Sequence, residues 1–140
     1  LARSSQTATD THRARSCYNH LAGRLGVLLT ERLVALDVLT LHDDAIKPGP
    51  RYRAFLDDIG IEPPLVSPGR PLAKPCLDWT ERRHHISGPL ATAIMEKSLE
   101  SNWLERRTGS RALTVTVDGF DALERWFGLG REVINGRDRA

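Results

Sequence analysis

Two pairs of cysteine and histidine are the residues of this chain best suited to chemistry. Cys17 precedes His20 with the spacing C-x2-H, and Cys76 lies upstream of His85. If the first pair lies on a helix, both side chains occupy one face, one turn apart. Thiolate and imidazole groups in such an arrangement are ligands for zinc or another thiophilic metal. The four residues therefore form a candidate metal, thiol-sensing or effector site.

The same residues also have a structural interpretation, which the sequence leaves open. Free cysteine is usually a small buried side chain, and the histidines could bond to the backbone at helix starts. Asp78 and His84 are spare ligands beside the second pair. Because no orienting third residue, oxyanion loop or glycine-rich phosphate loop accompanies Cys17 and His20, we do not expect an enzyme.

A duplication within the sequence gives these pairs their significance. Residues 20–25 (HLAGRL) return as residues 85–90 (HISGPL), and the match continues at a constant offset. His85 should therefore occupy in the second copy the place that His20 has in the first. Two ligands from each half would then make a closed tetrahedral site where the copies meet.

The composition is that of an ordinary globular protein. Hydrophobic residues make up 40% and charged residues 27%, and the formal net charge of +2 is too balanced to indicate a nucleic-acid binder from bulk electrostatics. No apolar run approaches the roughly 20 residues that cross a bilayer, so we expect no membrane partner. Two cysteines without a secretory signal favour reduced thiols and a cytoplasmic location.

The periodicity of the apolar residues predicts the elements that must position these groups. Residues 103–107 meet a turn at 108–110, and residues 111–117 alternate in polarity, which predicts a β-hairpin with Leu113, Val115 and Val117 on one face. Each copy is thus expected to consist of a helix, a strand or hairpin, and a second helix. The other predicted elements are a helix over about 21–37, a strand at 38–41, a loop at 42–50, a helix over about 50–59 ended by Gly60, a helical turn at 76–83, a helix over about 86–99 and a last helix capped by Asp118.

Two further groups of residues are candidates for binding. Trp79 and Trp103 could line an apolar effector pocket between the copies, although packing in a core is the commoner role of tryptophan. Arg106, Arg107 and Arg111 bracket the hairpin turn. A basic hairpin tip can rest on phosphates and position a protein on DNA without reading bases.

Two long motifs resemble a known family. Residues 17–26 (CYNHLAGRLG) resemble the segment C-Y-x-H-L-A-G-x-L-G of a group of bacterial ArsR-type transcriptional regulators. Residues 70–83 (RPLAKPCLDWTERR) match a second signature of that group, which runs into H-x-x-G-x-L, and the hairpin at 109–113 also fits. The resemblance covers roughly residues 13–129. His84 departs from it, since the group often has proline there.

The resemblance implies what the chain does. In that group these segments lie C-terminal to a winged-helix DNA-binding domain, so DNA would be bound mainly through an N-terminal domain that is not in this chain. The missing initiator methionine agrees with that expectation. The resemblance further implies a regulatory role that responds to a small-molecule or metal effector, in a homodimer.

The predicted fold class is α+β, with two winged-helix-like repeats packed with pseudo-twofold symmetry. The predicted function is the regulatory C-terminal domain of an ArsR-like regulator, for effector binding or dimerisation. Two alternatives remain: a purely structural dimerisation module, and an accessory DNA-binding module that uses the basic hairpin. The expected divisions are a tail or linker at 1–12, a first repeat at 13–62, a proline-rich connector at 63–75, a second repeat at 76–130 and a charged tail at 131–140.

Overall fold

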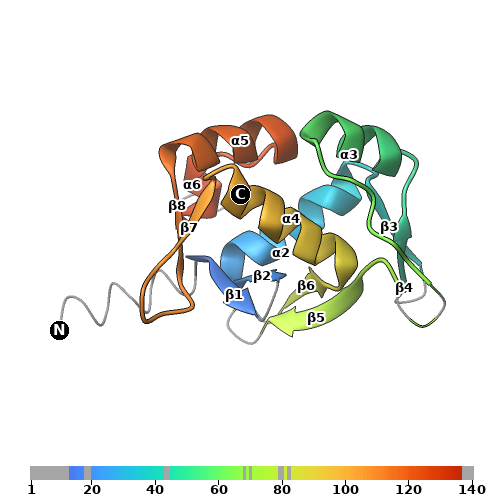
Figure 1. Cartoon of the computed structure of the whole chain (residues 1–140), viewed down its shortest axis with the longest axis horizontal. Coiled ribbons are helices and arrows are strands. Elements are labelled where there is room, and N and C mark those ends of the chain that lie inside the picture. Colours follow the sequence, from blue (N-terminus) through green and yellow to red (C-terminus); the bar gives the residue numbers. More distant parts are fainter. Residues whose placement is uncertain are drawn as a thin grey trace.

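The computed structural model describes residues 13–17, 20–42, 45–67, 69, 71–78, 81 and 83–136 (Figure 1). The fold is mixed α+β, with small antiparallel two-stranded sheets. The elements are β1 (Arg15–Cys17), β2 (His20–Ala22), α2 (Gly23–Ala35), β3 (Leu39–His42), β4 (Ala45–Pro48), α3 (Tyr52–Ile59), β5 (Lys74–Asp78), β6 (Arg83–Ser87), α4 (Pro89–Glu100), β7 (Leu104–Arg106), β8 (Leu113–Val115), α5 (Val117–Phe127) and α6 (Arg131–Ile134).

The duplication seen in the sequence is also present in the structure. The order hairpin, helix, hairpin, helix occurs once from β1 to α3 and again from β5 to α5. Asp37 and Asn102, the positive-φ residues other than glycine in the described chain, have φ of 62° and 59°. Their spacing in the sequence equals that of the two motif histidines, and so does the spacing of Gly23 and Gly88, which also have positive φ. Because non-glycine residues seldom adopt this conformation, its recurrence at corresponding positions agrees with the repeated order of elements.

The two halves pack against each other by a reciprocal exchange of contacts. Helices α2 and α4 lie in the middle of the molecule, with the hairpins β3–β4 and β7–β8 at opposite ends (Figure 1). Strand β2 of the first half packs against α4, and β6 of the second half packs against α2. Isolated bridges also join Arg15 to Ala112 and Ile46 to Ala73, so each opening hairpin contacts the second hairpin of the other half.

One hydrophobic core serves both halves, as expected for two copies that pack together. The rings of Phe55 on α3 and Phe127 on α5 meet edge to face, with centroids 5.6 Å apart. Arg32 on α2 donates a hydrogen bond of 2.7 Å to the Phe127 carbonyl at the end of α5. The core includes Leu25, Leu29, Leu33 and Leu56 from the first half and Leu90, Ile94, Leu113 and Leu123 from the second.

Helix α2 packs against β2 of its own half and against β6 of the other half. A Cβ on Gly26 would lie 2.5 Å from the Leu21 carbonyl oxygen, so only glycine fits there without a shift of the backbone. One turn later, Thr30 donates a 2.9 Å hydrogen bond to the Gly26 carbonyl and accepts a 3.0 Å bond from the Ile86 backbone N–H. The α2 helix of one half thereby holds the β6 strand of the other.

Three of the predicted elements are wrong. The helix considered for Cys17 and His20 is not formed, because these two residues pair across the hairpin β1–β2. Residues 76–83 are expected as a helical turn, but they belong to the hairpin β5–β6. The loop expected at 42–50 contains β4, which pairs with β3. In each case the structure has a short hairpin where a helix, a helical turn or a loop is expected.

The second half also differs in detail from the expectation. The hairpin β7–β8 is confirmed, but Val117 begins α5 and is 70% exposed, so it does not share the buried face of Leu113 and Val115. The α5 cap is Thr116, whose hydroxyl accepts a 2.8 Å bond from the Gly119 N–H, and Asp118 lies in the first turn. Helix α3 and its left-handed end at Gly60 are confirmed.

Residues 131–136 are expected to begin a charged tail, but the structure contains a helix there. Helix α6 buries Ile134 completely. Asn135, the residue that follows α6, accepts a 3.1 Å hydrogen bond from the Arg13 guanidinium. This short helix therefore fastens one end of the described chain to the other. Within the described ranges, each helix is too short or too polar to span a bilayer.

The Gly26 contact yields the first prediction. Gly26→Ala should lower the free energy of unfolding by roughly 1–3 kcal/mol, because the added methyl group overlaps backbone that cannot move freely. Gly69→Ala is the matched control, since a Cβ there meets nothing within 4 Å. Urea unfolding followed by circular dichroism measures both variants. Equal stability of the two variants would contradict the close approach of Gly26 to the Leu21 carbonyl.

Candidate metal centre

The candidate centre combines one residue from the first half with two from the second. Cys17 ends β1, Cys76 lies in the middle of β5, and His85 lies directly opposite Cys76 on β6. Directly opposed residues of an antiparallel pair project from the same face, so the second hairpin presents a thiol and an imidazole together. Because β2 packs beside β6, the first hairpin brings Cys17 to that face.

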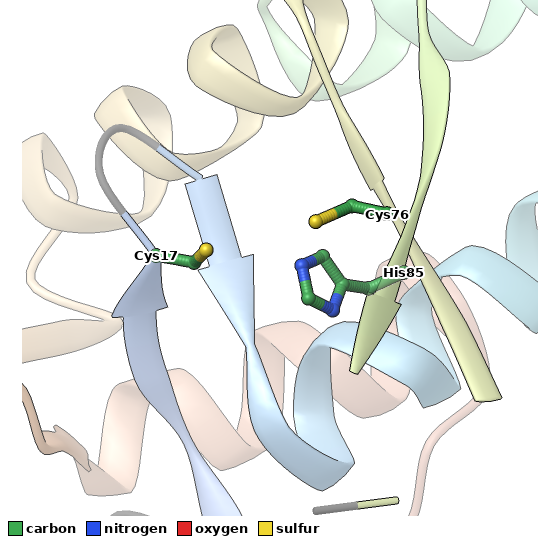
Figure 2. A group of neighbouring side chains, drawn as sticks. All are labelled: Cys17, Cys76 and His85. Carbon is green, nitrogen blue, oxygen red and sulfur yellow. The ribbon is translucent and has the colours of Figure 1, made fainter. Parts of the chain in front are cut away.

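The side chains of these residues converge. Their ligand atoms all lie within 4.8 Å of one another. Figure 2 shows the Cys17 and Cys76 sulfurs on either side of one ring nitrogen of His85, while the other ring nitrogen points away. His85 is 2% exposed and both cysteines are half-buried. The group is thus a compact donor set that solvent reaches through the thiols.

The donor set has the chemistry that a thiophilic metal requires. Zinc binds thiolate sulfur at about 2.3 Å and imidazole nitrogen at about 2.0 Å, which places tetrahedral donors roughly 3.5–3.8 Å apart. The 4.8 Å bound on the present separations exceeds this by roughly 1 Å, a gap that rotation of the half-buried cysteine side chains can close. Three donors leave a fourth position for another ligand, as in open metal sites.

The α2–β6 junction positions the imidazole. A Cβ on Gly26 would lie 3.5 Å from the His85 Cβ, an ordinary van der Waals distance, so this face of α2 packs directly beside the histidine. The hydrogen bond from the adjacent Ile86 N–H to Thr30 fixes the strand at that point. Arg83 also pairs with Glu31 on α2 at 3.0 Å, but both side chains are 50% exposed, so this ion pair adds little stability.

The other predicted ligands have different positions. The backbone of His20 pairs with Cys17, whereas its side chain lies outside the described part of the structure, as does that of Asp78. His84 is exposed and adjacent to His85 on β6, so it projects from the opposite face of the hairpin. The structure thus brings together Cys17, Cys76 and His85 of the predicted set.

The predicted tryptophan pocket has different surroundings from those expected. Trp79 lies outside the described residues. Trp103 is half-buried and borders an open concavity of ≈ 670 Å³ beside α5. The other residues of that concavity belong to the second half and are mainly charged: Asp118, Asp121, Ala122, Glu124, Arg125 and Trp126. Trp103 therefore does not line an apolar wall between the copies.

The predicted basic residues lie on the β7–β8 hairpin. Arg106 ends β7 and is exposed, as is Arg111, while Arg107 is half-buried. The Arg111 carbonyl accepts a 3.0 Å hydrogen bond from the Ser16 N–H, which ties this hairpin to β1. Two of the three guanidinium groups are thus accessible at one end of the molecule.

Sequence reasoning did not identify Gly26 and Thr30 as positioning residues. The signal that could have found them is a glycine within an apolar helical pattern, which costs roughly 1 kcal/mol relative to alanine and indicates close packing. A threonine one turn later can turn its hydroxyl to the backbone. No sequence pattern pointed to its partner, because Ile86 lies in the other half.

Comparison with known proteins identifies a relative. Over 122 residues the chain is 37% identical to the "Uncharacterized HTH-type transcriptional regulator YdfF" of Bacillus subtilis. The chain is similar to a transcriptional regulator. The match covers 86% of this chain and 54% of the relative, so the chain spans about half the length of the regulator. No family model matches the chain. No solved structure matches it.

The convergence of the two thiols yields the second prediction. Diamide, which accepts the two thiol hydrogens, should convert Cys17 and Cys76 into an intramolecular disulfide because their sulfurs lie within 4.8 Å. Titration with a thiol reagent should then find close to no free thiol, and a non-reducing gel should show a monomer. Cys17→Ser should form only intermolecular products. Two thiols that survive diamide in the native chain, but not in urea, would contradict the geometry.

Proposed function

We propose that this chain is the regulatory part of a transcriptional regulator and that Cys17, Cys76 and His85 form its sensing site for a thiophilic metal ion. The observation that carries the proposal is the convergence of two thiols and an imidazole, from both halves, within 4.8 Å. Zinc is the reference ion, because its preferred ligands are these groups. The role is non-enzymatic.

The regulatory part of the proposal is supported by the similarity to the Bacillus regulator. We assign the chain to the ArsR-type regulators on the motifs at residues 17–26 and 70–83. In this assignment each half is a winged-helix-like repeat, the halves are related by a pseudo-twofold axis, and the protein is a cytoplasmic homodimer. DNA is bound mainly by a winged-helix domain N-terminal to the segment described here.

The proposed mechanism uses the position of the site between the two opening hairpins. A metal ion bound to Cys17 from β1 and to Cys76 and His85 from the second hairpin crosslinks the two halves. The crosslinked arrangement is therefore favoured over any arrangement in which the hairpins separate. Such a bias changes DNA affinity only to the extent that the DNA-bound and free states differ in this arrangement.

The site itself yields the third prediction. Equilibrium dialysis of the reduced chain should find one zinc ion per chain, and cadmium should produce the ultraviolet charge-transfer band of a metal thiolate. Cys17→Ser and Cys76→Ser should each weaken binding at least about tenfold, since each removes a ligand. His20→Ala tests the fourth ligand position, because the backbone of His20 is paired with Cys17.

The matched control is His42→Ala, which removes an exposed histidine from β3 and should leave zinc binding unchanged. Absence of stoichiometric metal in the wild-type chain would reject the sensing site. If both cysteine variants also retained the oligomeric state of the wild type in size-exclusion chromatography, the purely structural dimerisation module would be the better assignment.

A further inference from the structure

A cavity separate from the concavity beside α5 lies on the side of the β5–β6 hairpin that faces away from the candidate metal centre. Its volume is ≈ 390 Å³, which is within the range of about 300–1,000 Å³ found for small-molecule pockets. Helix α2 and the hairpin β3–β4 form the walls from the first half, and β5 and β6 form the wall from the second. Six of its nine lining residues are apolar: Val34, Leu39, Leu41, Ile46, Pro75 and Ile86.

The cavity leaves large apolar side chains in contact with solvent. Leu41 on β3 is 59% exposed and Val34 on α2 is 39% exposed, although both belong to a concave surface. Covering such side chains removes apolar area from water, which is worth about 25 cal/mol per Å². The cavity is thus energetically suited to an apolar occupant that fills it.

The polar side chains of the cavity are few, namely Thr30 on α2 and His84 and His85 on β6. The Thr30 hydroxyl already donates to the Gly26 carbonyl and accepts from the Ile86 N–H. His85 contributes to the cavity wall but faces the thiols with one ring nitrogen (Figure 2). His84 is exposed at the rim, so its imidazole is the polar side chain that an incoming molecule meets first.

We propose that this cavity binds a small, mostly apolar molecule that carries one hydrogen-bond-accepting or acidic group, with the apolar body between Val34 and Leu41 and the polar group beside His84. The volume of the cavity limits the size of the ligand, and the apolar walls require that most of the ligand be apolar. The His84 imidazole provides its one polar contact. The proposal does not depend on metal binding.

The test uses 8-anilinonaphthalene-1-sulfonate, an aromatic fluorophore with one acidic group, and the full chain kept reduced and free of metal by a chelator. Its fluorescence should rise and saturate at one probe per chain. Leu41→Glu and Val34→Glu should each weaken binding about tenfold, because each places a charge on an apolar wall. His84→Ala should weaken binding by a smaller factor. The Leu41→Glu and Val34→Glu variants show that the probe occupies this cavity.

Leu65→Glu is the matched control, because Leu65 is 92% exposed in the connector and lies outside the cavity lining. It should bind the probe as the wild type does. Circular dichroism of each variant confirms that the fold is retained. Equal binding by the wall variants and the wild type would overturn the proposal. A concentration-dependent dimer that Leu41→Glu dissociates and Leu65→Glu does not would also overturn it, since the surface would then join two copies of the chain.

Discussion

The rest of the structure depends on the close contact between helix α2 and strand β6. A Cβ on Gly26 would lie at an ordinary van der Waals distance from the His85 Cβ, and Thr30 one turn later bonds to the Ile86 N–H. This contact joins the two halves, because α2 belongs to the first and β6 to the second. A buried backbone N–H without a partner costs about 1–3 kcal/mol, so the hydroxyl both holds β6 in place and removes that cost. The core, the candidate centre and the apolar cavity are all built around this junction.

The duplication and the regular helices were predictable from the sequence, whereas the elements that carry the centre were not. Local signals fixed α3, α4 and the β7–β8 hairpin, since apolar spacing and terminal glycine act within a few residues. The C-x2-H spacing is ambiguous, because residues three apart face each other both on a helix and across a tight hairpin. The pairing of Cys76 with His85, and their approach to Cys17, come from contacts between distant segments that no local pattern contains.

The β5–β6 hairpin separates two chemically different environments. Cys76 and His85 project toward β1, whereas Pro75, Ile86 and the exposed His84 border the apolar cavity. This division follows from the alternation of side chains along a strand. Because His85 contributes to both surroundings, displacement of its ring changes the donor set and a wall of the cavity together. A two-stranded ribbon is thin enough for such a residue to serve both sides.

The placement of the donors on separate halves has a consequence for the order of folding. Thr30 and Ile86 are 56 residues apart in the chain, so the contact that aligns the hairpins closes a long loop. Its entropic cost must be met before the contact forms, which slows folding relative to local helix formation. During synthesis, Cys17 leaves the ribosome long before Cys76 and His85. The Cys17 thiol is therefore without the other two donors for that interval, and the donor set can be complete only after the second half has been made and has packed against the first.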